Sequence, residues 1–121
     1  MPNEQPLVFI DLTPEYQKSL RELSKRFRNI RSDVQPIIEQ LQQGNFAGDR
    51  IAGFGEEYIV YKVRVRNSNI QKGKSAGYRL IYQVESPTSI LLLAIYSKSD
   101  REDIGLNELR EIMADFYGES T

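Results

Sequence analysis

The sequence predicts an α+β fold in which a small antiparallel β-sheet is packed on one face by an N-terminal helical hairpin and a C-terminal helix. Apolar residues recur every three or four positions in residues 14–44 and 106–116, which is typical of amphipathic helices. Residues 58–96 instead alternate or form short apolar runs, as strands do. The expected element order is β-α-α-β-β-β-α. A chain of 121 residues suits one domain with one modest core, so we expect residues 1–121 to form a single domain.

The first strand and the first helix are separated by a strong helix-start signal. The apolar run Leu7-Val-Phe-Ile10 predicts the strand. Thr13 and Pro14 then suit the N-cap and the first helical position. Spacings of four and three residues predict the apolar stripe of the helix, which consists of Tyr16, Leu20, Leu23, Phe27 and Ile30.

A second helix is predicted after a short connection. Ser32 and Gln35 match a capping box, Pro36 lies within the first turn, and Gly44 marks the end. Neither helix can bury its apolar stripe alone, so the two are expected to form an antiparallel hairpin that packs on the sheet.

Three strands and a final helix follow. Residues 58–66 alternate, with apolar side chains on one face and Lys62, Arg64 and Arg66 on the other. Strands at 78–85 and 89–96 are joined by a turn at Pro87, and the Leu91–Ile95 run lacks alternation, as expected of a central strand covered on both faces. The last helix is predicted by Leu106, Leu109, Ile112, Met113 and Phe116.

Charge is unevenly distributed along the chain. Seven Lys and Arg residues lie between Ile59 and Lys98 against the single acid Glu85, a net of about +6 in a chain whose total charge is −1. This segment predicts a local site for a polyanion. The acidic residues of 99–121 are interpreted as a solvated helix face or, alternatively, as a negative cover for the basic sheet. Asp100 to Asp103 fit the N-terminal cap of the last helix better than a metal site.

The chain contains no histidine and no cysteine. Disulfides, thiolate metal sites and histidine-based acid–base catalysis are therefore excluded, and we expect neither a cofactor nor a metal. Any proton transfer must use Tyr, Lys, Asp or Glu. The longest apolar run, Ile90–Ile95, is too short to span a bilayer, and no signal-peptide core follows Met1. The expected location is the cytoplasm, without a membrane partner.

Three segments, taken in order, resemble the RelE/ParE toxin superfamily, and more closely its HigB-like branch. They are Val60-Tyr-Lys-Val-Arg-Val-Arg66, Gly77-Tyr-Arg-Leu-Ile-Tyr82 and Ile95-Tyr-Ser-Lys-Ser-Asp100. The predicted element order agrees with this superfamily. The resemblance implies the toxin of a type II toxin–antitoxin system. RelE-like members cleave messenger RNA in the ribosomal A site and so stop translation, whereas ParE-like members inhibit DNA gyrase.

The resemblance carries over to individual positions. The Tyr-Lys-x-Lys-x-Arg pattern of RelE-like toxins falls on Tyr61–Arg66, with Arg64 in place of the second lysine, and the Gly-Tyr-Arg element falls on Gly77–Arg79. The longer insertion between them, which contains Lys72 and Lys74, is typical of the HigB-like branch. The C-terminal Arg and Tyr of RelE-like toxins have no clear match here, although Tyr96 and Lys98 lie near that place.

These residues support RNA cleavage without metal or histidine, because the RNA 2′-hydroxyl is itself the nucleophile. Lys62 or Tyr96 is the candidate base, since crowded cations are expected to lower the pKa of a neighbouring Lys or Tyr. Arg79 is the candidate phosphate clamp. Arg64 and Lys98 would stabilise the transition state or the leaving group. The expected RNA contacts are Arg66, Lys72 and Lys74 to the backbone, and Tyr78 or Tyr82 stacked on a base.

The leading hypothesis is therefore a metal-independent, ribosome-dependent mRNA endoribonuclease that inhibits translation. The alternatives are a ParE-like gyrase inhibitor, or a non-catalytic RNA- or partner-binding domain on the same scaffold. The same cations also fit the solvent face of any half-buried strand, and Tyr82 and Tyr96 fit a purely structural role. The expected partners are mRNA on the ribosome and a cognate antitoxin of helix-turn-helix type. The antitoxin would dock on the basic strand or on the basic side chains Arg21, Lys25, Arg26, Arg28 and Arg31.

Overall fold

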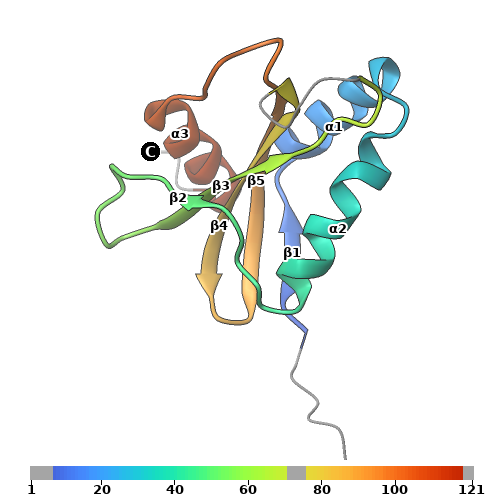
Figure 1. Ribbon diagram of the computed structural model, residues 1–121. Coiled ribbons are helices and arrows are strands. Elements are labelled where there is room, and N and C mark those ends of the chain that lie inside the picture. The colour runs from blue at the N-terminus through green and yellow to red at the C-terminus, as the bar shows by residue number, and fades with distance from the viewer. Residues whose placement is uncertain (1–6, 71–75, 119–121) are drawn as a thin grey trace, which may run out of the picture.

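The chain folds as an α+β structure of a five-stranded mixed sheet and three helices, seen in a computed structural model that describes residues 7–70 and 76–118 (Figure 1). The sheet order is β1-β5-β4-β3-β2. The elements are β1 (Phe9–Leu12), α1 (Pro14–Arg26), α2 (Ile30–Gln42), β2 (Asp49–Arg50), β3 (Ile59–Val65), β4 (Tyr78–Ser86), β5 (Ser89–Ser97) and α3 (Leu106–Tyr117). The short strand β2 lies within a stretch that the sequence predicts as loop.

The sheet is mixed, so the prediction of a purely antiparallel sheet is wrong. β1 pairs in parallel with β5, from Phe9 opposite Ser89 to Leu12 opposite Leu92. The β5–β4, β4–β3 and β3–β2 pairs are antiparallel. β1 and β5 are neighbours in space but are connected through both helices and two further long strands, and such a crossover is what parallel pairing requires.

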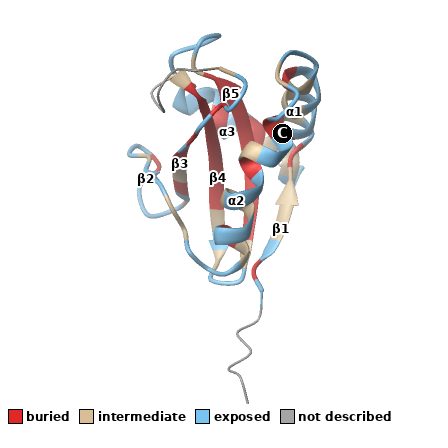
Figure 2. Cartoon of the chain, turned by 45° about the vertical axis from the view of Figure 1, so that its right-hand side comes forward, coloured by how far each residue is buried: buried red, intermediate tan, exposed pale blue. Residues whose placement is uncertain are grey.

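Helices cover both faces of the sheet, so the prediction that they share one face is also wrong. α1 and α2 pack against side chains such as Val63, Tyr82 and Leu92, whereas α3 packs against Ile81 and Leu91 on the opposite face. Figure 2 shows β4 and β5 buried along most of their length. Both central strands carry apolar side chains on both faces, and each face must be covered to bury them. We call these faces the α1/α2 face and the α3 face.

One extra residue in β5 decides which side chains point to which face. In one half of the β4–β5 pair Tyr82 lies opposite Leu92, and in the other half Ile81 lies opposite Ala94. Leu93 is left without a partner, which is the geometry of a β-bulge. Leu93 and Ala94 consequently both pack on the α3 face. Every residue of β5 beyond the bulge has its orientation reversed relative to an uninterrupted strand.

Thr13 links the bulge to the start of α1. Its side chain is fully buried, and its Oγ1 accepts a hydrogen bond from the Tyr16 N–H at 2.9 Å, as expected of an N-cap residue. The same hydroxyl donates to the carbonyl oxygen of Leu93 at 2.8 Å. The prediction of Thr13 as the N-cap is thus confirmed. Its hydroxyl also supplies a hydrogen bond to the Leu93 carbonyl oxygen in the bulge.

The second helix starts earlier than the predicted capping box. α2 begins at Ile30 with Asn29 as its N-cap, and the Ser32 hydroxyl donates back to the Asn29 carbonyl oxygen at 2.9 Å. Ile30 is fully buried, so starting the helix there places this side chain in the core. Pro36 consequently lies inside α2 instead of in its first turn.

Replacing Thr13 by alanine should lower the free energy of unfolding by about 2 kcal/mol, because it removes the cap and leaves the Leu93 carbonyl without its donor. Thr13→Ser keeps the hydroxyl and serves as the control, with a much smaller loss. Urea unfolding followed by circular dichroism measures both. Equal stability of the alanine and serine variants would show that the hydroxyl does not hold the bulge.

Candidate functional site

The basic side chains of β3 lie on the α3 face of the sheet. Val63 and Val65 pack on the α1/α2 face, so the alternating Lys62 and Arg64 point the other way, and Arg66 follows directly after the end of the strand. The predicted alternation of this strand is confirmed. Arg64 and Arg66 are exposed and Lys62 is half-buried.

Register places Arg64 directly opposite Arg79 of β4, and Arg79 directly opposite Tyr96 of β5. Three predicted site residues from three strands therefore form one row across the α3 face. We call Lys62, Arg64 and Arg79 the cationic cluster. Like charges directly opposite on neighbouring strands destabilise a sheet. The register thus brings two arginines side by side on one face, an arrangement that suits an anionic ligand.

Arg79 is much less accessible than Arg64. Only 6% of its surface is exposed, and its Nη1 donates to the Tyr78 carbonyl oxygen at 3.2 Å. Directly before this strand, Gly77 approaches β3 so closely that a Cβ would lie 2.1 Å from the Val65 carbonyl oxygen. The glycine of the Gly-Tyr-Arg element is therefore required by backbone packing, which holds Arg79 in its register with Arg64.

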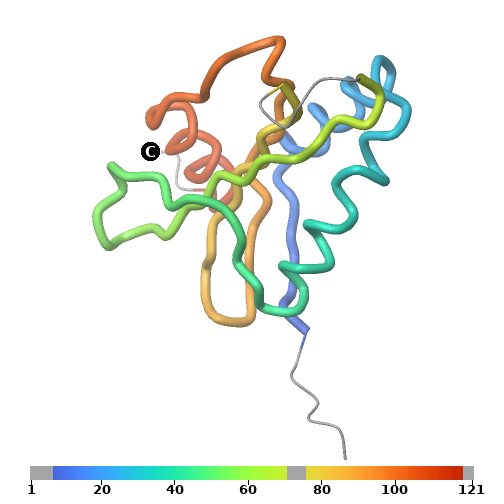
Figure 3. Tube along the Cα trace, in the orientation of Figure 1, coloured from blue at the N-terminus to red at the C-terminus, as the bar shows by residue number. Residues whose placement is uncertain are grey.

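An acidic side chain from the segment after β5 contacts the same face. This segment arcs over the end of the sheet before α3 begins (Figure 3). Asp103 Oδ1 lies 3.1 Å from Lys62 Nζ and accepts hydrogen bonds from the Tyr96 hydroxyl at 3.3 Å and the Ile104 N–H at 2.8 Å. Partial desolvation raises the pKa of Asp103, but these hydrogen bonds and Lys62 outweigh it and bring the pKa below its usual value. Asp103 is therefore an ionised carboxylate at neutral pH.

Tyr96 is not activated as a base. Burial, followed by the charge and hydrogen bond of Asp103, raises its pKa to about 12, while Arg79 and Arg101 only partly oppose this. The expectation that crowded cations lower the pKa is wrong for this residue, because burial and the Asp103 carboxylate together outweigh Arg79 and Arg101. The guanidinium of Arg101 also lies over the Tyr96 ring, 5.6 Å from its centroid. At neutral pH Tyr96 is a hydrogen-bond donor.

The remaining predicted cations are placed differently. Lys98 Nζ donates to the Glu102 carbonyl oxygen at 2.9 Å, so it is engaged by the segment that leads to α3. Lys72 and Lys74 lie outside the described residues. On α1, Arg26 forms an ion pair with Asp100 at 2.6 Å. The positive charge of Arg26 is therefore already compensated by a neighbouring carboxylate.

The prediction that Tyr78 or Tyr82 stacks on a base is wrong. Both side chains are fully buried on the α1/α2 face, opposite to the cationic cluster. Tyr78 packs edge-on against Phe27, with ring centroids 5.8 Å apart. Tyr82 stacks on Tyr61 at 5.5 Å and donates its hydroxyl to the Ala47 carbonyl oxygen. Alternation along β4 explains this. Tyr78 and Tyr82 are both an odd number of residues away from Arg79, so they point to the opposite face of the sheet.

Sequence reasoning missed Asp103 and Arg101 as site residues. α3 begins after Gly105, so Asp100 to Asp103 do not cap it, and the alternative interpretation as a negative cover fits Asp103. The only available signal was the acidic cluster that follows the basic strands. In the described part of the chain, no three acidic side chains converge in a way that could hold a metal ion.

Comparison of the chain with models of known protein families gives no match, and comparison with curated protein sequences gives none. The resemblance to RelE/ParE toxins therefore stays a prediction. Among the helices of residues 7–70 and 76–118, none is both long and apolar enough to cross a bilayer.

Replacing Asp103 by asparagine should lower the pKa of Tyr96 from about 12, because it removes the negative charge that disfavours the tyrosinate. The pKa can be measured by NMR on protein labelled at the tyrosine Cζ, with Tyr96→Phe used to assign the signal. Glu102→Gln is the matched control, since it removes a neighbouring charge and leaves Asp103 in place. An unchanged Tyr96 titration in Asp103→Asn would contradict the described contact.

Proposed function

We propose that the protein is a metal-independent endoribonuclease that cleaves mRNA on the ribosome, as the toxin of a type II toxin–antitoxin pair. The observation that carries this proposal is the Arg64–Arg79 pair, two arginines directly opposite each other in the strand register on one face of the sheet. Guanidinium binds phosphate oxygens in bidentate fashion, so the pair suits a phosphodiester better than a neutral ligand. The resemblance of the surrounding segments to RelE-like toxins supports the same substrate.

The contacts of Asp103 also support an anionic ligand. Its carboxylate accepts from the Lys62 ammonium and the Tyr96 hydroxyl, both on the α3 face beside the arginine pair. A phosphate group offers the same kind of acceptor oxygens to the same donors. Asp103 is more than half exposed, so it can be displaced by a competing anion without exposing core side chains. In this proposal Asp103 keeps Lys62 and Tyr96 in place while RNA is absent.

The proposed reaction uses the 2′-hydroxyl of the RNA as nucleophile. The 2′-oxygen attacks the adjacent phosphorus and the bond from phosphorus to the 5′-oxygen breaks, while the 2′-hydroxyl gives its proton to water and the 5′-oxygen takes a proton from water. The products are a 2′,3′-cyclic phosphate and a 5′-hydroxyl. Negative charge develops on the phosphoryl oxygens, where Arg64, Arg79 and Lys62 would stabilise it. Tyr96 would donate a hydrogen bond, because its raised pKa keeps it neutral.

The proposed partner that silences this activity is a cognate antitoxin of helix-turn-helix type. One docking surface is the cationic cluster itself. The other is the exposed basic surface of α1, the connection after it and the start of α2, from which Arg26 is withdrawn by its ion pair with Asp100. Four exposed cations remain there, and they would steer an acidic antitoxin segment electrostatically: Arg21, Lys25, Arg28 and Arg31.

Arg64→Ala should reduce the rate of mRNA cleavage on purified ribosomes by about 100-fold, since it removes one of the cations that would stabilise the transition state. Arg64 is exposed, so the fold should be unaffected. Arg28→Ala removes the same charge from an exposed position away from the sheet and should change the rate less than about twofold.

Primer extension locates the cleavage, and product analysis in EDTA concentrations that keep ribosomes intact tests the chemistry. A 3′-hydroxyl product, or full activity of Arg64→Ala, would overturn the proposed mechanism. Inhibition of gyrase supercoiling without any RNA cleavage would replace the nuclease by the ParE-like alternative.

A further inference from the structure

A small apolar groove lies between β1, α1 and α2, on the α1/α2 face of the sheet. Its volume is about 280 Å³, and six of its nine lining residues are aliphatic. The proposed RNA cleavage does not use it, because the cationic cluster lies on the opposite face. We call it the hairpin groove.

The aliphatic side chains of the hairpin groove are incompletely covered. Four of them, Ile10, Leu12, Leu20 and Ile38, are only half-buried, although they pack on the core. Contiguous apolar surface with a polar rim is typical of an interaction site. The volume lies just below about 300 Å³, where pockets for free small ligands begin. The groove therefore suits one or two aliphatic side chains of a larger partner.

Tyr16 contributes a hydroxyl group without a partner to the groove. Its side chain is only 2% exposed, and its hydroxyl forms no hydrogen bond within residues 7–70 and 76–118. A tyrosine hydroxyl at a buried position usually has a hydrogen-bond partner. Burial raises the pKa of Tyr16 to about 12, which Arg31 only partly opposes. The hydroxyl therefore keeps its proton at neutral pH and can donate to a ligand.

Arg31 brings a positive charge to the same groove. It lies in the first turn of α2, is exposed, and is close enough to Tyr16 to act on the pKa of its hydroxyl. Arg31 forms no hydrogen bond or ion pair in the described part of the chain. The lining of the groove contains no acidic residue. A hydroxyl donor and a guanidinium beside aliphatic side chains suit a carboxylate that is attached to an apolar segment.

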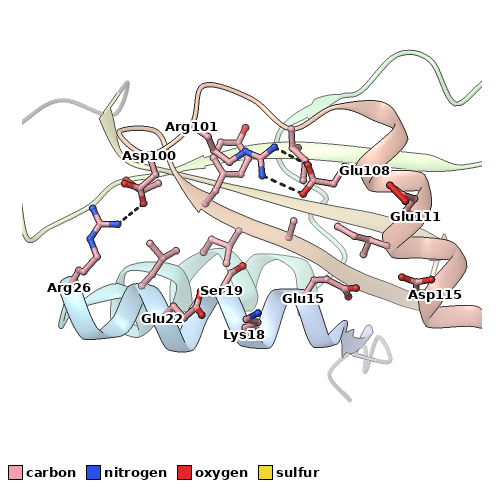
Figure 4. Close-up of a pocket in the computed structure, with 17 residues that line it drawn as sticks. Glu15, Lys18, Ser19, Glu22, Arg26, Asp100, Arg101, Glu108, Glu111 and Asp115 are labelled. Carbon is pink, nitrogen blue, oxygen red and sulfur yellow. Dashed lines mark hydrogen bonds and ion pairs between the residues drawn. The ribbon is translucent and has the colours of Figure 1, made fainter.

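The charges around the groove also favour an acidic partner. Asp11 points to the opposite face of the sheet, because it lies between the groove residues Ile10 and Leu12. Glu15 and Glu22 line a different groove, on the α3 side of α1 (Figure 4). On α2, Asp33 accepts hydrogen bonds from Ser68, and Glu39 accepts one from Gln35. Exposed cations instead follow the groove residue Leu20 along the chain: Arg21, Lys25 and Arg28.

We propose that the hairpin groove binds an acidic amphipathic helix of a partner protein, whose aliphatic side chains enter the groove and whose carboxylate accepts from Tyr16 and Arg31. An amphipathic helix that lays its apolar face in a groove is a common mode of recognition. The neighbouring cations would steer the acidic helix to this place. Only the identification of the partner with the antitoxin rests on the proposed function. The site itself is tested by binding alone, and it holds whether or not the protein cleaves RNA.

The experiment uses a twelve-residue peptide of glutamate and alanine with leucine at positions 3, 6, 7 and 10, acetylated and amidated at its ends. It is titrated at low salt into the full chain labelled at its methyl groups. We expect saturable binding below about 1 mM, with the largest NMR shifts at Ile10, Leu12, Leu20 and Ile38. A peptide with alanine in place of every leucine keeps the charge and should bind at least about tenfold more weakly. A peptide with lysine in place of glutamate should not bind.

Two arginine variants with equal charge changes locate the peptide. Arg31→Gln should weaken its binding about fivefold, whereas Arg64→Gln on the opposite face should leave affinity within about twofold. Both positions are exposed, so both variants should fold normally. Tyr16→Phe keeps the buried ring, removes the donor, and should weaken binding about threefold. Absence of binding, a loss in Arg64→Gln equal to that in Arg31→Gln, unchanged affinity of Tyr16→Phe, or unchanged affinity of the alanine peptide would each overturn the proposal.

Discussion

The hydrogen bond from the Thr13 hydroxyl to the Leu93 carbonyl oxygen holds the β-bulge of β5. The arrangement of side chains on the α3 face depends on this bulge. Leu93 is the extra residue of β5, and it shifts the register between β4 and β5 by one. Continuing the register of Tyr82 with Leu92 along the strand would place Tyr96 opposite Tyr78, in the core under α1. The bulge places it opposite Arg79 instead, on the face that carries Arg64 and Lys62. One unpaired residue therefore brings the aromatic and the cationic side chains together.

The same local geometry contributes to a groove between α1 and α3 (Figure 4). Thr13 is where the chain leaves the edge of β5 and enters α1, so α1 in place of a strand lies beside β5 beyond Leu92. Tyr96 and Arg101 both line the groove. Tyr96 also donates its hydroxyl to Asp103, and the guanidinium of Arg101 lies over the Tyr96 ring. The proposed anion site on the sheet and this groove are thus adjacent, and the segment of Asp100 to Asp103 lies between them. Acidic side chains in this segment bind cations on both sides, Arg26 through Asp100 and Lys62 through Asp103.

Much of the fold follows from local sequence patterns. The N-cap at Thr13, the alternation of β3 and the apolar stripe of α3 are each short-range signals, and the structure contains all three elements. The bulge could not be predicted, because the run Leu91-Leu-Leu-Ala-Ile95 has no alternation that would mark an inserted residue. For the same reason the sequence did not reveal that Tyr96 shares a face with Arg79. The contact between Lys62 and Asp103 joins residues 41 positions apart and depends on the tertiary fold. Tyr78 and Tyr82 were misassigned because an aromatic residue on a strand looks the same in sequence whether it faces solvent or core.

Nuclear Overhauser effects of the Tyr96 ring test this account most directly, because its position depends on the register that the bulge creates. The account predicts cross-peaks from the Tyr96 ring to side-chain protons of Arg79 and Arg101, which lie on the α3 face. Cross-peaks to Tyr78 and Phe27 in their place would mean that β5 is not bulged at Leu93. In that case Tyr96 would lie in the α1/α2 core, on the opposite face of the sheet from Arg64 and Arg79.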